Sequence, residues 1–318
     1  MPIGQPDEGR TGPSGRLRRF DRPWRMSLVP QALLDFELPA APQRIDELPA
    51  AVVGAEAVRV HAPAGRFMLL CSEGALAVAF EATLFDLLAE ARYPAPRPRR
   101  ARGGSLIARL SRPGGGAAAA ACYAWPPGEE LDPASASAPQ LLELGRLLAR
   151  LHQLGEAHPA SVADPCESAG LLARVPAGAA DRDRLAAVLS SPLPALPSGA
   201  VHGGLRPARA LFIGDRCSAV LPSGAACSAA LVLDLAETAV GCLVGAKRPA
   251  AALRALVSGY QSLRRLLPEE REGLFGALRM AAARDGALRA IRGEKKVLRA
   301  LEEVEGVGEV EVLGAAGG

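Results

Sequence analysis

Residues 200–236 read AVHGGLRPARALFIGDRCSAVLPSGAACSAALVLDLA, and this stretch determines how the rest of the chain is interpreted. A short apolar run leads into a His-Gly-Gly triplet, and two further apolar segments, 210–213 and 216–221, flank a Gly-Asp pair. A Gly-Asp pair between two such segments predicts a β-hairpin with a two-residue turn. After Gly224 a long apolar stretch carries a single acid, Asp234, and predicts a helix.

The composition of the 318-residue chain is that of a globular protein with room for two modest domains or one bilobed unit: 49% of its residues are hydrophobic and its formal net charge is +3. So small a charge does not indicate a nucleic-acid or membrane partner. The six cysteines show no CxxC spacing, which argues against zinc and disulfides. No apolar run has the roughly 18 residues of a membrane span, and no signal-peptide pattern is visible. We therefore expect a cytoplasmic protein.

The N-terminal segment, residues 1–27, is rich in Pro and Gly and contains six arginines. Its lack of apolar periodicity predicts a disordered basic tail. Translation from Met26 would leave most of this segment out of the protein, and we favour that interpretation. A basic arm for nucleic acid is the alternative.

Residues 28–126 are predicted to form a small β-rich unit. Its expected elements are strands at 51–54, 57–61 and 66–71, a helix at 76–92, and a hairpin made by 105–110 and 117–125. A run of prolines and arginines after Pro94 predicts a stiff extended connector between the helix and the hairpin.

Residues 127–303 are predicted to form a mainly helical unit. A strongly periodic helix at 139–154 carries His152 near its end, where we expect a structural role. Residues 155–200 show no motif and are interpreted as a variable loop-and-helix insert. Further helices are expected at 251–266 and 269–291, and the Gly-rich residues 304–318 are predicted to be a flexible tail.

The stretch 200–236 resembles the catalytic core of the aminoglycoside phosphotransferase and homoserine kinase family, whose pattern is HxDLxxxNxLF, a hairpin, IDF and then YDLA. Two other segments are similar to family motifs: RYPAPRP to GxPxPxP, and LGRLLARLH to LGxxLAxLH. The resemblance covers roughly residues 28–300. It implies an α+β, two-lobed protein-kinase-like fold, with a small antiparallel sheet lobe and a larger helical lobe. A doubly wound nucleotide fold is disfavoured, because no GxGxxG follows a strand.

The resemblance also shows that the chemical residues of the loop at 200–223 have been replaced. The family's catalytic Asp falls on Gly204, its metal-binding Asn on Arg209, and its metal-binding IDF Asp on Pro222. Phosphoryl transfer depends on metal-held phosphates and a positioned acceptor, so these replacements predict no catalysis. In the small lobe, Leu70 stands where kinases carry Lys and the homoserine kinase branch carries Thr, and no lysine precedes Lys247.

Other residues that match the family motifs are expected to have structural roles. His202 is expected to brace the loop through backbone hydrogen bonds, and Asp234 to accept backbone N–H groups from it. Glu81 and Asp86, which have no lysine to pair with, are interpreted as solvated surface acids.

Together these positions predict a pseudokinase with a binding or regulatory role and with no metal or other cofactor. Arg206, Arg209 and Trp125 are the possible ligand-binding residues, for a nucleotide or a small acidic ligand, although ordinary surface arginines in an Arg-biased chain are the favoured interpretation of the first two. A protein partner and a decayed paralogue remain alternatives. The contrasting hypothesis is an active homoserine- or aminoglycoside-type kinase that uses ATP and Mg²⁺. Its catalytic acids would have moved, with Asp215 at the hairpin tip and Glu237 deeper in the helix as candidates.

Overall fold

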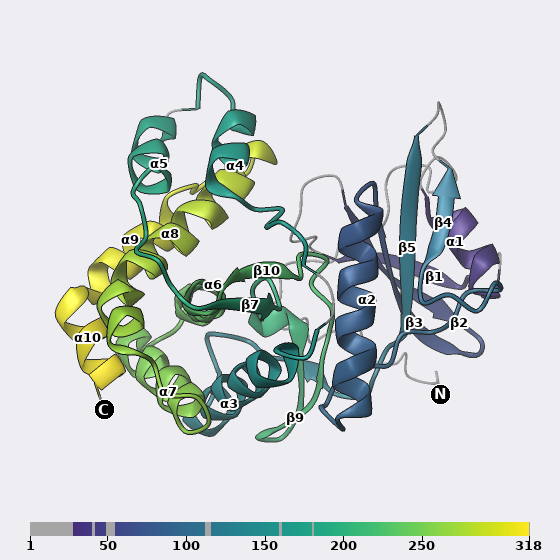
Figure 1. The fold of residues 1–318 in the computed structure, drawn as a ribbon, viewed down its shortest axis with the longest axis horizontal. Coiled ribbons are helices and arrows are strands. Elements are labelled where there is room, and N and C mark those ends of the chain that lie inside the picture. The colour runs from purple at the N-terminus through teal and green to yellow at the C-terminus, as the bar shows by residue number, and fades with distance from the viewer. Residues whose placement is uncertain are drawn as a thin grey trace, which may run out of the picture.

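Two lobes of different secondary structure lie side by side in the computed structural model (Figure 1). It describes residues 28–39, 42–48, 55–111, 116–158, 161–179 and 181–317. The two-lobed α+β fold is thereby confirmed. The predictions for residues 1–27 and for a strand at 51–54 lie outside the described residues.

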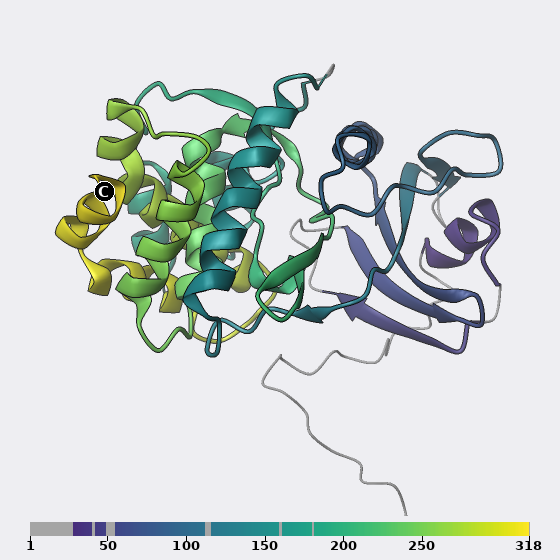
Figure 2. The same ribbon diagram turned by 90° about the horizontal axis from the view of Figure 1, so that it is seen from below.

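The small lobe is a five-stranded antiparallel sheet with strand order β1-β2-β3-β5-β4. Its elements are α1 (Val29–Asp35), β1 (Arg44–Leu48), β2 (Glu56–Ala62), β3 (Gly65–Ser72), α2 (Ala75–Glu90), β4 (Ala108–Ser111) and β5 (Ala117–Ala124). Because successive strand side chains point to opposite faces, the sheet has two apolar faces. One packs against α1 and the other against α2, which faces the large lobe (Figure 2).

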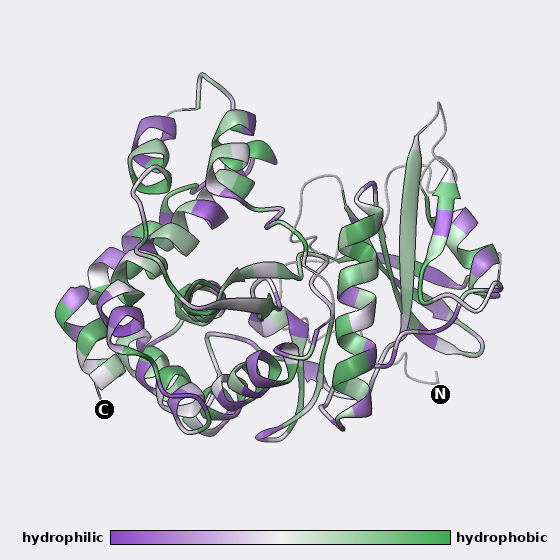
Figure 3. Cartoon of the chain, in the orientation of Figure 1, coloured by the Kyte–Doolittle hydropathy of each residue, from purple (hydrophilic) through white to green (hydrophobic). Residues whose placement is uncertain are grey.

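The large lobe is mainly helical and contains two small antiparallel sheets, β7-β10 and β6-β8-β9. Its elements are β6 (Glu129–Glu130), α3 (Ala138–Gly155), α4 (Ser168–Arg174), α5 (Arg182–Leu189), β7 (Ser198–Val201), the short 3₁₀ helix η2 (Pro207–Arg209), β8 (Ala210–Ile213), β9 (Arg216–Val220), β10 (Cys227–Ala230), α6 (Leu231–Leu243), α7 (Pro249–Gln261), α8 (Pro268–Ile291), α9 (Arg299–Val307) and α10 (Glu309–Gly317). Helix α6 is hydrophobic over most of its surface, as a core helix must be (Figure 3). None of the helices among the described residues is both long and apolar enough to cross a membrane.

Local sequence signals explain where these elements begin. Helix α3 starts with a capping box, in which the Ser137 hydroxyl accepts from Gln140 N and the Gln140 side chain accepts from Ser137 N. The hairpin β8–β9 turns at Gly214, whose φ of 62° suits glycine. The hairpin predicted from the Gly-Asp pair is therefore present.

Helices α3 and α7 cross with their backbones almost in contact. A Cβ atom added to Gly145 would lie 2.0 Å from Leu256 O, and one added to Gly259 would lie 2.0 Å from Leu142 O. The distance between packed helices depends on the side chains at their contact, so this crossing requires glycine on both helices.

Three expectations for the elements were wrong. Residues 304–317 do not form a flexible tail: they complete α9 and form α10, whose Val312 is fully buried together with Val304 of α9. The helix predicted after Gly224 begins only at Leu231, because 227–230 pair with β7 as a strand. The predicted insert at 155–200 also contributes β7 to the lobe. The many glycines of this segment suggested a flexible chain, although its apolar residues have the spacing of a helix.

Candidate functional site

Asp234 of α6 holds the loop that follows β7 by accepting backbone hydrogen bonds. Its Oδ2 accepts from His202 N at 2.8 Å and its Oδ1 from Gly204 N at 2.7 Å. The carboxylate is 2% exposed. Burial alone would raise the pKa of Asp234, but the hydrogen bond and charge of His152 outweigh it and the pKa is lowered. The acid is therefore ionised and committed to the loop.

His152 is buried behind this carboxylate. Its Nε2 lies 3.0 Å from Asp234 Oδ2, and its Nδ1 lies 2.8 Å from the Tyr260 hydroxyl. Both ring nitrogens thus bind neighbours in the helical core, and the ring orients Asp234 without facing the cleft between the lobes.

His202 occupies the inner side of the same loop. Its Nε2 lies 2.9 Å from Leu221 O, which links the loop to the end of β9. Burial lowers the pKa of His202, so the ring is neutral at physiological pH. The loop is therefore braced from two sides, by His202 and by Asp234.

The three positions that carry chemistry in the resembled family are all buried here. Gly204 has a φ of 87°, in the left-handed region that glycine adopts without strain. Arg209 is 6% exposed, and its Nη1 lies 4.0 Å from Met68 Sδ of the small lobe. Burial lowers the pKa of Arg209 to about 10, although Glu81 and Glu130 act in the opposite direction. Pro222 has no backbone N–H and no polar side-chain atom.

Glu81 is not a solvated acid, and this expectation was wrong. It is 2% exposed and crosses from α2 to the large lobe. Its Oε1 accepts from Ser223 N at 2.9 Å, from Gly224 N at 2.9 Å and from Ser223 Oγ at 3.2 Å. Burial raises the pKa of Glu81, while these donors and Arg209 lower it. Asp86, one turn further along α2, pairs near the surface with Arg97 at 3.1 Å.

These two acids of α2 provide a matched comparison. Replacing Glu81 with alanine should lower the free energy of unfolding by about 2–4 kcal/mol, because it leaves buried donors and the Arg209 charge without an acceptor. Replacing Asp86 with alanine should cost less than about 1 kcal/mol, as for other surface pairs. Urea denaturation of both variants measures the difference. Equal losses would mean that Glu81 contributes nothing beyond a surface acid.

The predicted patch of Arg206 and Arg209 is not an open anion site. Arg206 Nη1 donates to Asp285 Oδ1 at 2.5 Å, so its charge is balanced by a carboxylate of α8. Arg209 is buried among Glu81 and Glu130, which excludes an ordinary surface role as well. Arg206 is thus paired with a carboxylate of the protein itself, and the charge of Arg209 is opposed by two others.

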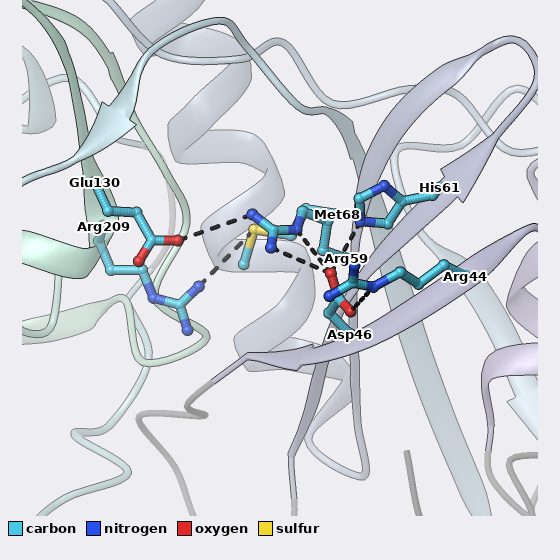
Figure 4. A network of polar contacts seen from close by, with 7 residues as sticks. All are labelled: Arg44, Asp46, Arg59, His61, Met68, Glu130 and Arg209. Atoms are coloured by element: carbon cyan, nitrogen blue, oxygen red, sulfur yellow. Dashed lines mark hydrogen bonds and ion pairs between the residues drawn. The ribbon is translucent and has the colours of Figure 1, made fainter. Parts of the chain in front are cut away.

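A network of polar contacts that the sequence interpretation missed joins strands β1 and β2 of the small lobe to Glu130 of the large lobe (Figure 4). Asp46 of β1 is 1% exposed and accepts from Arg44, Arg59 and His61. Arg59 also lies 4.0 Å from Glu130 of the large lobe. The spacing of Arg59 and His61, two apart on one strand, could have indicated a shared polar face.

Trp125 contacts this same network. Its ring is covered by the Arg59 guanidinium, whose central carbon lies 4.8 Å from the ring centroid. The ring is 8% exposed. A planar ligand could stack on this face of Trp125 only if Arg59 moved.

A separate small cavity lies on the large-lobe side of the loop. Its polar lining comes from Asp164, Cys166, Asp234, Glu237 and Arg284. Glu237 lies one turn further along α6 than Asp234, and its side chain nevertheless reaches the loop: its Oε2 would lie 3.4 Å from a Cβ at Gly204. Asp215, in contrast, accepts from the Ser137 hydroxyl at 2.7 Å and lies at the hairpin turn.

Comparison with known proteins identifies the family of the chain. Residues 55–274, more than half of the sequence, match the family described as the phosphotransferase enzyme family. The chain belongs to this family. Its relatives include the homoserine kinases of Rhodopseudomonas palustris (strain BisB18), 30% identical over 192 residues, and Parvibaculum lavamentivorans, 32% identical over 197 residues. These matches cover 56% of this chain and 57% and 58% of the relatives, so the chain spans just over half the length of these relatives.

Solved phosphotransferases share the fold. An amicoumacin kinase superposes with a TM-score of 0.63 at 14% identity, covering 86% of this chain and 89% of that chain. A microcompartment-associated aminopropanol kinase gives a TM-score of 0.60 at 16% identity, covering 90% of this chain and 98% of that chain. At such identities the likeness shows the two-lobed fold.

The residues present do not fit the metal ion that phosphotransferases of this kind use. A guanidinium at position 209 repels a cation, and Pro222 offers no side-chain oxygen. Glu81, an acid close to Arg209, already accepts three hydrogen bonds from Ser223 and Gly224 through the same oxygen. In the part of the chain that the structure describes, no three acid, His or Cys side chains are grouped to hold a metal.

Proposed function

We propose that this member of the phosphotransferase family is a pseudokinase with a binding or regulatory role. The observation that carries the proposal is Arg209, a buried cation at the position where a metal ligand is expected. Glu81, the acid whose charge acts on Arg209, is itself held by Ser223 and Gly224 and is not available to a metal. The scaffold around that position is kept, since Asp234 and His202 still brace the loop.

The pairing of Arg206 and Arg59 with carboxylates favours a particular class of ligand. Arg206 is paired with Asp285, and Arg59 contacts both Asp46 and Glu130. An anionic ligand would have to displace one of these carboxylates. The proposed role is therefore better served by a neutral or cationic small molecule, or by a protein partner, than by the nucleotide or acidic ligand predicted from the sequence.

The proposal predicts that magnesium adds nothing to nucleotide binding. In a thermal-shift titration with ATP, adding Mg²⁺ should change the melting temperature by less than about 1 °C. A saturating ligand at a hundred times its dissociation constant adds about 2.7 kcal/mol, worth several degrees for a chain of this size. The homoserine kinase of Rhodopseudomonas palustris, treated identically, is the control. A Mg²⁺-dependent rise of several degrees would overturn the pseudokinase proposal.

One observation favours a second candidate, an active ATP-dependent small-molecule kinase whose catalytic groups have moved. The carboxylate of Glu237 lies against the position of the missing side chain at Gly204. Such a kinase would still need a metal site, so the same Mg²⁺ titration separates the two candidates.

A further inference from the structure

The cavity beside the loop contains a carboxylate that does not belong to the loop. Glu237 lies on α6, three residues after Asp234, so both acids project from the same side of the helix. Asp234 holds the backbone of Gly204, and Glu237 reaches the space in front of that residue. A Cβ on Gly204 would meet Glu237 Oε2 at 3.4 Å and Glu237 Cβ at 3.5 Å. The side chain of Glu237 thus occupies the volume that a longer side chain at position 204 would enter.

The two oxygens of this carboxylate have different surroundings. Oε1 accepts from Arg284 Nη1 at 3.1 Å, and the same Nη1 donates to Asp164 Oδ2 at 2.8 Å. Among the described residues, no hydrogen bond is made to Oε2. This free oxygen belongs to a side chain that is 15% exposed and lines the cavity.

Arg284 adds an unused donor to the same cavity. The residue is 8% exposed, and its Nε is buried without a hydrogen-bond partner among the described residues. Buried polar atoms in folded proteins nearly always have a partner, so an orphaned N–H beside a cavity points to a ligand or a water that completes it.

The charges around Glu237 come from every element that packs against it. They are Arg284 of α8, Asp234 of α6, Asp164 of the 161–167 segment and Arg206 of the loop. Cys166 also lines the cavity, as a thiol whose pKa burial raises to about 12. Burial raises the pKa of Glu237 to about 7, against the opposing effect of Arg284.

We propose that Glu237 supplies from α6 the ligand-binding carboxylate that position 204 lacks. Its Oε2 accepts a hydrogen bond from a hydroxyl or ammonium group of a small neutral or cationic molecule, and Arg284 Nε donates to an oxygen of that molecule. With three acids, Asp164, Asp234 and Glu237, and one arginine along its polar wall, the cavity does not attract anions. The inference rests on the binding role proposed above and assigns it to a site.

The test measures binding of L-homoserine and of 1-amino-2-propanol by calorimetry, without nucleotide or metal. Since a hydrogen bond to a charged acceptor is involved, Glu237→Gln should weaken binding by roughly ten- to a hundredfold. Asp86→Asn is the control, because it removes a carboxylate of the small lobe that pairs with Arg97 and does not line the cavity, and it should weaken binding by less than about threefold. Equal effects of the two variants, or no binding of either probe to the wild-type chain at millimolar concentration, would overturn the proposal.

Two further readouts separate a binding role from a structural one. In the exchange variant Gly204→Asp/Glu237→Ala, the carboxylate is supplied by the loop instead of α6, and binding should recover at least about tenfold over Glu237→Ala alone.

The pH dependence of binding is measured on the wild-type chain, so it does not depend on whether a variant folds. Affinity should rise as the pH increases through about 7, because the ionised carboxylate of Glu237 is the acceptor. A flat pH profile, or an exchange variant no better than Glu237→Ala, would contradict the assignment. Since no ATP or Mg²⁺ is present, the result is independent of the pseudokinase test.

Discussion

Replacing Asp234 with alanine should lower the free energy of unfolding by about 3–5 kcal/mol, which would unfold much of a marginally stable chain. The substitution removes the acceptor of three buried donors: His202 N, Gly204 N and His152 Nε2. None of them can reach water instead, because the site is buried. Guanidinium denaturation at neutral pH, followed by circular dichroism, measures the loss.

The control for this prediction is Asp215→Ala at the β8–β9 turn. Asp215 accepts one exposed hydrogen bond, from Ser137 Oγ, so its removal should cost less than about 1 kcal/mol. If the two variants lost stability equally, Asp234 could not be the anchor of the loop.

The effect of Asp234 should also depend on pH. The folded-state pKa of Asp234 is lowered, so its contribution is fully present above the unfolded-state pKa of about 3.9 and is lost as the pH falls through the folded-state pKa. The stability difference between the wild-type chain and Asp234→Ala should therefore stay constant near neutrality and shrink only in acid.

The second large effect is expected where α3 and α7 cross. Gly259→Ala places a methyl group 2.0 Å from Leu142 O, and neither backbone can withdraw without opening the helical core. Overpacking of this severity should cost roughly 3 kcal/mol or more. Differential scanning calorimetry would detect the lower melting temperature.

A matched glycine makes the comparison direct. Gly306 lies in α9 with no atom within 4 Å of an added Cβ. Gly306→Ala should stabilise the chain by about 0.5–1 kcal/mol, since alanine favours the helix and restricts the unfolded state. A Gly259→Ala variant as stable as the wild-type chain would show that the crossing is looser than described.

The sequence predicted the scaffold well where the signal was local. The β8–β9 hairpin followed from its Gly-Asp pair, and α3 from its apolar periodicity. Sequence separation explains what was missed. Glu81 binds Ser223, 142 positions away, and no local pattern reports such a contact. Glu237 was within reach of prediction, because the spacing of three from Asp234 places both acids on one face of a helix.

The arginines of the loop show a second limit. Their charge was visible in the sequence, but the acids that balance it come from α8 for Arg206 and from α2 and β6 for Arg209. A positive patch is a property of the folded surface. It therefore cannot be derived from one segment when the balancing carboxylates lie on distant segments.

The position of Glu81 between the lobes affects how the molecule unfolds. In a bilobed protein each lobe can in principle unfold by itself, and relative motion of the lobes is the default expectation. Here a buried acid of the small lobe binds the backbone of the large lobe at Ser223 and Gly224. Swinging the lobes apart would expose that acid and strip both N–H groups of their acceptor. Unfolding of the small lobe should therefore destabilise the loop of the large one, and we expect the two lobes to unfold together.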